Sequence, residues 1–176
     1  MSYQERPAET EFAEYYRNYV GLVPDGDIIA ILATQIEDTL ALVRDLTEQQ
    51  ALHAYAPGKW SVKQVIGHII DAERIFGYRI LRFARRDTTP LASFNENEYA
   101  ANAMSDSRPL ASLVAELSAV RRATVALLAG LPADPWTRSG PASGYDVSVR
   151  AIAWITAGHE LHHREILTSR YLTGAS

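Results

Sequence analysis

Four stretches of this chain repeat apolar residues at the spacing of an α-helix, and no stretch alternates like a convincing strand. The predicted helices cover roughly residues 27–46, 61–83, 109–129 and 146–172, the last beginning at Asp146 or Ser148. Ser61 and Gln64 form a capping box for the second helix, Ser107 is the expected cap of the third, and Gly130 ends it. The pattern therefore predicts an all-α protein.

Two of the connections between these helices are long. Residues 87–106 link the second and third helices and contain a predicted short helix at Asn95–Ala100. Residues 130–145 link the third and fourth, and another short helix is expected at Glu9–Val20. A long crossover makes the second and third helices parallel, which predicts a four-helix bundle in up-down-down-up order. We expect a single domain over residues 1–176, with 1–24 as an N-terminal extension or short helix.

Composition narrows the possible functions. The net charge of −4 provides no basic footprint, so nucleic-acid binding is not expected. The chain has no cysteine, which excludes disulfides, thiolate metal sites and cysteine nucleophiles. Its polar N-terminus is not a signal peptide, and no apolar run approaches membrane-spanning length. We expect a cytoplasmic protein that contacts neither nucleic acid nor membrane, and a homodimer, because helical bundles of this kind often pair through apolar faces.

Three histidines lie where the predicted helices can bring them together. His159 and His163 are four residues apart in the fourth helix, so their imidazoles share one face, one turn apart. His68 lies in the second helix. Two such nitrogens and a third from a facing helix can hold a divalent metal and leave one coordination position open. The spacing thus predicts a metal site at His68, His159 and His163.

The heights of the histidines along their helices agree with this topology. At a rise of about 1.5 Å per residue, His68 lies roughly 10 Å from the start of its helix. His159 and His163 lie about 15–20 Å from the end of theirs. The heights nearly match if the two helices are antiparallel, as up-down-down-up order requires. Each histidine taken singly fits an ordinary helix residue hydrogen-bonded in or near a core, whereas three at one height favour a metal site.

Three further polar residues are expected around the histidines. Asp71 could orient an imidazole, occupy a coordination position, or pair with Arg74 at the rim. His162 falls on the flank of its helix, so we place it behind the ligands or at the rim. Gln64, one turn before His68, is also placed beside the pocket.

Glu160 gives the fourth helix a second metal motif. His159, Glu160 and His163 satisfy the HExxH string of zinc proteases, in which the glutamate is the general base beside the metal. By its helical position Glu160 points away from the buried seam, and a solvated pair with Arg164 is the simpler expectation. A protease helix of that class normally packs beside a sheet, so the protease is the weaker alternative.

Aromatic residues are assigned mainly to packing. Trp60 precedes the second helix and is expected to pack on it, and Trp136 and Trp154 are expected in the core or an interface. Tyr78 and Tyr99 are also assigned to the core, with pocket lining as the alternative. The crossover at residues 87–106 is the expected wall of the pocket.

The stretch Tyr55–Glu73 resembles the start of the second helix in the DinB-like (damage-inducible) metal-binding helical-bundle superfamily, including its metal-dependent hydrolase branch. It carries the superfamily's GKWS at 58–61, followed by His68 and Asp71, and residues 159–163 resemble its C-terminal histidine pair. The resemblance covers most of the chain. It implies an up-down-down-up bundle with a three-histidine metal site, commonly for nickel or zinc.

The resemblance implies less about the reaction. Similar members include metal-dependent hydrolases and transferases or isomerases that use low-molecular-weight thiols. We therefore expect a metal-dependent hydrolase or a thiol-dependent S-transferase acting on a small molecule. Zinc or nickel is the expected metal, with iron or manganese as alternatives, and a low-molecular-weight thiol is a candidate second cofactor. The alternative function is a non-catalytic binding or stress-response module that the metal stabilises.

Overall fold

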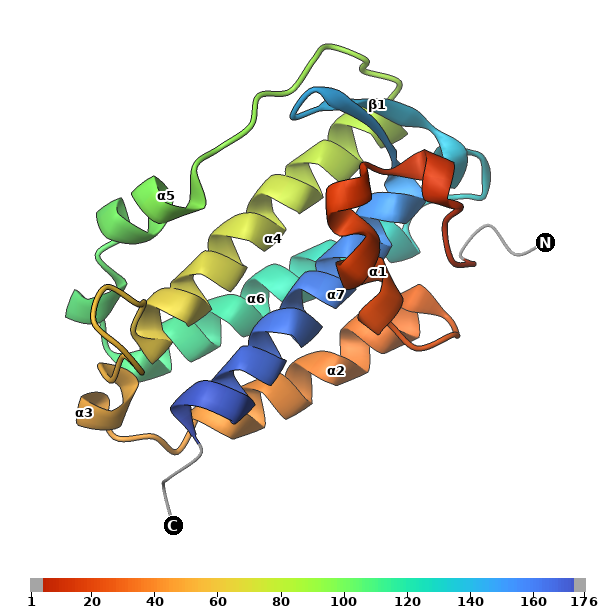
Figure 1. Ribbon diagram of the computed structural model, residues 1–176. Coiled ribbons are helices and arrows are strands. Elements are labelled where there is room, and N and C mark those ends of the chain that lie inside the picture. Colours follow the sequence, from red (N-terminus) through yellow and green to blue (C-terminus); the bar gives the residue numbers. More distant parts are fainter. Residues whose placement is uncertain (1–4, 173–176) are drawn as a thin grey trace.

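The chain folds into a bundle of four long helices (Figure 1). The structure, a computed structural model, describes residues 5–172. The long helices are α2 (Ile28–Val43), α4 (Val62–Ala84), α6 (Leu110–Ala129) and α7 (Val149–Ile166). The outer ends of the expected domain, residues 1–4 and 173–176, lie outside the described part. The all-α prediction is confirmed for the bundle.

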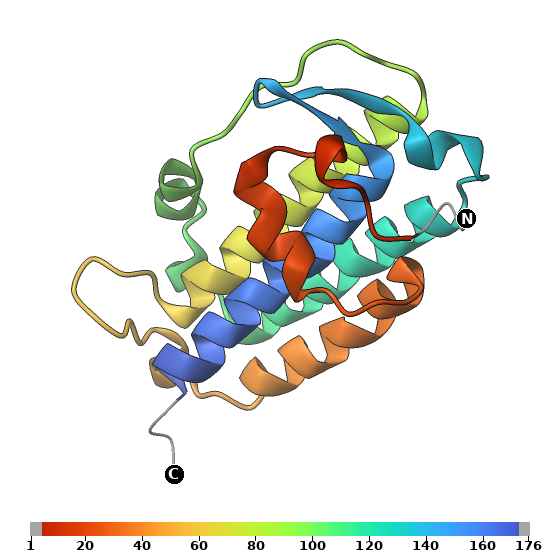
Figure 2. The same ribbon diagram turned by 45° about the vertical axis from the view of Figure 1, so that its right-hand side comes forward.

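The predicted up-down-down-up order is also confirmed. Figures 1 and 2 show α2 and α7 running in one direction and α4 and α6 running in the other. The antiparallel crossing of α4 and α7 places His68, near the start of α4, against His163, near the end of α7. A short helix, α3 (Glu48–Ala51), lies in the connection between α2 and α4.

Capping residues account for where the long helices begin. Ser61 caps α4 as predicted: its hydroxyl accepts the Gln64 N–H, and the Gln64 side chain accepts the Ser61 N–H, both at 3.0 Å. Ser148, one of the two predicted starts, caps α7. The predicted cap Ser107 is wrong, because this residue ends a 3₁₀ turn and α6 begins after Pro109. The fixed φ of proline suits a helix start.

An N-terminal segment lies across α7 and replaces the single helix expected over Glu9–Val20 (Figure 2). It consists of two 3₁₀ turns (Glu9–Glu11 and Glu14–Tyr16) and the short helix α1 (Arg17–Leu22). At Gly158 of α7, an added Cβ would lie 1.9 Å from the Tyr19 carbonyl oxygen. The missing side chain therefore allows α1 to bury a flank of α7 that would otherwise face solvent.

The connection between α6 and α7 contains a β-hairpin, so the expectation of no strand is wrong. β1 (Ser139–Ala142) pairs antiparallel with β2 (Tyr145–Ser148). Ser143 and Gly144 form the turn with positive φ, as two-residue hairpin turns require. Each strand has four residues, which is too short for the alternation of apolar and polar residues to stand out.

The crossover between α4 and α6 passes over the same face of the bundle as the hairpin (Figures 1 and 2). Its helix α5 (Glu96–Asn102) confirms the short helix predicted there, with Asn95 as the cap. Leu91 of the crossover forms a bridge with Ala142 of β1. The crossover and the hairpin thus form one cover.

The aromatic assignments are partly confirmed. Trp136 and Trp154 are buried in the core, whereas Tyr78 and Tyr99 are exposed, contrary to expectation. Tyr78 lies on the outer face of α4, where the Arg82 guanidinium stacks over its ring.

Among the helices of residues 5–172, none has the length and apolar character needed to cross a membrane.

Candidate metal centre

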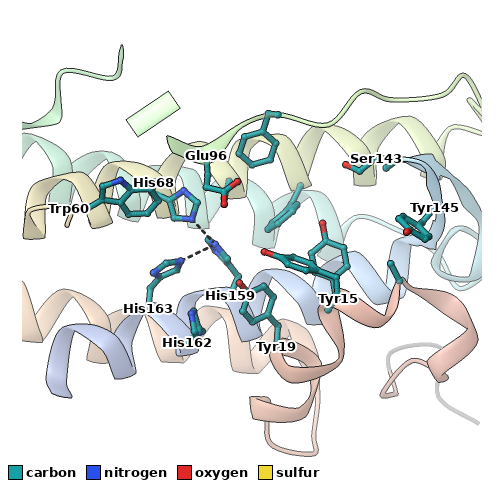
Figure 3. Close-up of a pocket in the computed structure, with 16 residues that line it drawn as sticks. Tyr15, Tyr19, Trp60, His68, Glu96, Ser143, Tyr145, His159, His162 and His163 are labelled. Carbon is teal, nitrogen blue, oxygen red and sulfur yellow. Dashed lines mark hydrogen bonds between the residues drawn. The ribbon is translucent and has the colours of Figure 1, made fainter. Parts of the chain in front are cut away.

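The three predicted ligands come together at the crossing of α4 and α7. Figure 3 shows the rings of His68, His159 and His163 converging on one another. The Nε2 atom of His159 lies 2.9 Å from that of His68 and 3.2 Å from that of His163. All three residues are buried, and their candidate ligand atoms lie within 4.8 Å of one another.

The donor set fits a divalent metal in both geometry and charge. Zn–N bonds of about 2.0–2.1 Å in tetrahedral coordination place two nitrogens about 3.4 Å apart, close to the observed separations. Burial lowers the pKa of His68 to about 4 and that of His163 to about 3, and it holds the pKa of His159 well below its usual range. The imidazoles are therefore neutral at pH 7, which is the form that binds a metal.

Aromatic rings pack around these imidazoles. The Trp60 ring lies 4.8 Å from the His68 ring, between centroids, and Tyr19 and Phe76 meet His159 edge-on at 5.6 and 5.8 Å. Trp60 does pack on its own helix, as expected, but it does so against a candidate ligand. These contacts restrict rotation of the imidazoles and keep their nitrogens directed at a common point.

The histidines line a cavity of about 660 Å³, a size suited to a small molecule. Its wall carries seven aromatic side chains besides the histidines: Tyr15, Tyr16, Tyr19, Trp60, Phe76, Phe94 and Tyr145. Figure 3 shows the histidines towards one end of this cavity and Ser143 and Tyr145 towards the other. The crossover was expected to form a wall, and it does so through Phe94 and Glu96. The N-terminal segment, the hairpin, Trp60 and the inner faces of α4 and α7 supply the other parts.

Arg79 of α4 joins the three covering segments. Its Nη2 donates to the Ala92 carbonyl oxygen of the crossover at 3.0 Å and to Ser143 Oγ of the hairpin at 2.9 Å. It also hydrogen-bonds Tyr16 of the N-terminal segment. The guanidinium is buried, so it holds the cover in place, with these donors directed at the protein itself.

The three residues predicted around the histidines have different positions. His162 lines the cavity, with its ring 5.1 Å from that of His163 between centroids. Gln64 and Asp71 are not among the described residues that line it. Gln64 is engaged in the helix cap. Burial raises the pKa of Asp71, against the opposing charge of Arg74.

The expected solvated pair of Glu160 with Arg164 is wrong. Glu160 is fully buried, and its Oε2 lies 2.6 Å from Nη1 of Arg121. Arg164 pairs with Asp38 of α2 instead, at 3.2 Å. The reason is tertiary: α7 is packed by α1, α2 and α4, so a flank position that would be solvated on a surface helix lies inside.

The protease arrangement is excluded by the same contacts. Besides its ion pair, Glu160 accepts hydrogen bonds from Gln35 and Thr39 of α2, each at 2.5 Å. Its carboxylate therefore faces α2 and α6, away from the histidines. The glutamate of a zinc protease must face the metal.

Sequence reasoning missed several residues of the cavity wall. Tyr15, Tyr16 and Tyr19 fall within the short helix expected at Glu9–Val20, and neither they nor Glu96 were expected to line the cavity. Clustered tyrosines in an N-terminal segment were the available signal. What that segment covers depends on the close approach at Gly158.

Fold and site together define a four-helix bundle whose three inward histidines can hold a divalent metal. The chain belongs to the DinB superfamily, whose family model matches residues 31–167. That match spans the four long helices from the first turn of α2 to the end of α7.

Relatives and a solved structure agree with this placement. A Bacillus pumilus (strain SAFR-032) protein named "Putative metal-dependent hydrolase" is 28% identical over 146 residues, covering 81% of this chain and 80% of its own length. A Bacillus mycoides (strain KBAB4) protein of the same description is 28% identical over 157 residues, covering 86% and 89%. The fold is similar to YfiT from Bacillus subtilis, described as "a probable metal-dependent hydrolase with an unusual four-helix bundle topology", with a TM-score of 0.74, 17% identity, and coverage of 96% of this chain and 93% of that one.

Proposed function

We propose that this protein is a metal-dependent hydrolase that acts on a small molecule, with His68, His159 and His163 as the metal ligands. Imidazole donors suit zinc and nickel, which we propose first, and also iron; manganese is a further candidate. Relatives described as metal-dependent hydrolases support the reaction class.

One observation carries the proposal: three neutral imidazole nitrogens converge at the wall of a cavity of about 660 Å³. Three protein ligands leave a coordination position free, as catalytic zinc sites do, whereas structural sites are closed by four. The cavity counts against the non-catalytic alternative, because a metal that merely held the helices together would need no space beside it.

The residues of the chain have separable tasks in this function. The histidines hold the metal, which supplies Lewis acidity that activates water near neutral pH. The aromatic wall binds the apolar part of the substrate and excludes bulk water. Arg79 keeps the covering segments closed over the cavity.

Metal analysis followed by an activity panel tests this proposal. Purified protein should take up about one divalent ion per chain, and zinc- or nickel-loaded protein should hydrolyse members of an ester, amide and lactone panel. A chelator should abolish the turnover, and added metal should restore it. If the protein takes up no divalent metal, the whole class of function fails.

A thiol-dependent S-transferase is the second candidate, and one observation favours it. A smaller cavity of about 230 Å³ shares Trp60 and His163 with the main one and is also lined by Lys59, Asn97 and Tyr171. A transferase needs room for two substrates at one centre, and two cavities that meet at His163 provide it. Product analysis with a panel of low-molecular-weight thiols separates the two: S-conjugates indicate transfer, and water-derived products indicate hydrolysis.

Assembly and location remain predictions. Pairing of two copies can be measured by light scattering of the purified chain, and a monomer at micromolar concentration would contradict it. A cytoplasmic location can be checked by fractionation.

A further inference from the structure

Glu96 has a singular position in the cavity. Among the described residues that line the cavity, it is the one carboxylate. Figure 3 shows its side chain entering from the crossover side and directed towards the histidines. Burial lowers the pKa of His68 and raises the pKa values of Tyr16 and Tyr19. The negative charge of Glu96 acts on all three groups as a smaller effect, so its carboxylate lies near them.

The other carboxylates near the histidines, including Glu165, do not line the cavity. Glu73 and Glu160 both pair with Arg121 on the far side of α7 from the cavity. Asp71 lies outside the described cavity wall. Glu96 lines the cavity, and within residues 5–172 no ion pair or side-chain hydrogen bond of its carboxylate is found. A carboxylate that faces a cavity without a protein partner is free to interact with a ligand there.

The local structure holds Glu96 in place. It is the first residue of α5, which Asn95 caps by accepting the N–H groups of Asn97 and Glu98. Ala100 of the same helix is buried, and α5 packs against α4. The carboxylate is therefore presented from a structured element.

Glu96 is also separate from the ligand set. The three histidine nitrogens lie within 4.8 Å of one another, and no oxygen of Glu96 belongs to that cluster. Hydrolysis needs a group that removes a proton from the attacking water and delivers one to the leaving group. A carboxylate that faces the ligands without joining them has the right chemistry for this task.

We propose that Glu96 is the catalytic proton carrier of the hydrolysis, an inference that rests on the proposed function. Its carboxylate takes one proton from water as the water oxygen forms a bond to the carbonyl carbon of an ester or amide. It then gives that proton to the leaving oxygen or nitrogen as the bond to carbon breaks. The carboxylate ends unchanged, and water is the sole co-reactant.

His162 is the competing proton carrier. It lines the cavity, and burial lowers its pKa, so it is largely neutral at pH 7 and could accept a proton. It lies behind His163 on α7, however, and contacts Tyr19. Figure 3 shows it on the α7 side of the cluster, with Glu96 on the opposite side.

The test compares Glu96→Gln with Glu98→Gln in the zinc-loaded full chain. Both glutamates are exposed on α5, and Glu98 is not among the residues of the cavity wall, so it is a matched control. The first readout is binding of acetohydroxamate, which ligates a metal and donates a proton to a neighbouring carboxylate. The second is hydrolysis of p-nitrophenyl acetate. Zinc content and circular dichroism verify that each variant is folded and loaded.

Glu96→Gln should weaken acetohydroxamate binding by about tenfold or more, because a charge-assisted hydrogen bond is lost. It should also slow hydrolysis by about 10²–10⁴-fold. Glu98→Gln should change neither. Wild-type binding and hydrolysis in Glu96→Gln would overturn the role of Glu96 alone, as would the same losses appearing in His162→Ala instead. If zinc-loaded wild type neither binds the hydroxamate nor hydrolyses the ester, both this role and the proposed function fail.

Discussion

His159 and Glu160 are consecutive in α7, yet they belong to two different polar clusters in one core. On one side of α7, Glu160 and Glu73 share the Arg121 guanidinium, with N–O separations of 2.6 and 2.8 Å. Arg121 also donates to the Leu32 carbonyl oxygen. On the other side, His159 meets two further histidines with nitrogens directed at one another.

The two clusters differ in whether protein groups pair their polar atoms. The ion cluster is closed, because protein groups pair its charges: burial alone would lower the pKa of Arg121, but the two carboxylates raise it. The histidine cluster lies beside a cavity, and its neutral imidazoles direct their Nε2 atoms at one another. A closed buried network holds helices in register, whereas converging donors beside a cavity are typical of a binding site. Pairing and an adjoining cavity thus separate the closed ion cluster from the candidate metal site, without reference to sequence motifs.

The largest expected effect comes from opening the closed cluster. Arg121→Met leaves two buried carboxylates without their cation, and we expect a loss of about 3–5 kcal/mol in the free energy of unfolding. Urea unfolding measures it. Arg122→Met, on the exposed side of the same helix, is the control and should change stability by less than about 0.5 kcal/mol. Equal stability of the two variants would contradict a structural role for the cluster.

Removing one member of the open cluster should affect metal binding more than folding. His159→Ala should weaken zinc affinity by more than about 100-fold, since even outer partners of metal ligands contribute about 10–100-fold. Competition with a chromophoric chelator measures the affinity. His162→Ala is the matched control in the same helix and should keep the affinity within about tenfold. Unchanged zinc affinity in His159→Ala would remove this residue from the ligand set.

The open cluster should also make the metal-free protein sensitive to mild acid. The folded-state pKa values of His68 and His163 are about 4 and about 3, below the value near 6.5 of an unfolded chain. At pH values between the folded-state and unfolded-state pKa values, the unfolded state therefore binds more protons than the folded state. The free energy of unfolding thus falls as pH drops below about 6.5. The expected slope is roughly 1 kcal/mol per pH unit for each histidine.

Urea unfolding with a chelator present, between pH 7 and 5, measures this slope. His163→Leu removes one titrating group and should flatten the curve. Stability that stays constant over this range in wild type would show that the histidines protonate without unfolding the core.

The smallest effect is expected at the surface pair that replaced the predicted one. Arg164→Ala breaks a contact with Asp38, whose side chain is largely exposed, so the loss should be below about 1 kcal/mol. A double-mutant cycle with Asp38→Ala isolates the coupling. A coupling energy as large as the stability loss expected for Arg121→Met would mean that solvent exposure does not determine how strongly an ion pair stabilises this protein.

Much of the fold could be predicted because its signals are local. The Ser61–Gln64 capping box and the apolar stripes mark the helices through hydrogen bonds and spacing within a few residues. The histidine set could be predicted too, since a crossover sets helix direction and a fixed rise sets height. Predictions failed where burial depends on distant segments. Glu160 was expected on the surface and is buried, whereas Tyr78 was expected in the core and is exposed.

The sequence by itself therefore determined the helices, their order and the three histidines that converge, because periodicity, caps and rise per residue are properties of neighbouring residues. The tertiary structure alone decided that Glu160 lies in a closed ion cluster and that Glu96 faces the cavity. Both outcomes depend on which distant surfaces pack together, as at Gly158, where a missing side chain allows the N-terminal segment to cover α7. Packing of those surfaces decides which side chains are buried. It also decides whether a charged group is paired by the protein or left free to contact a ligand.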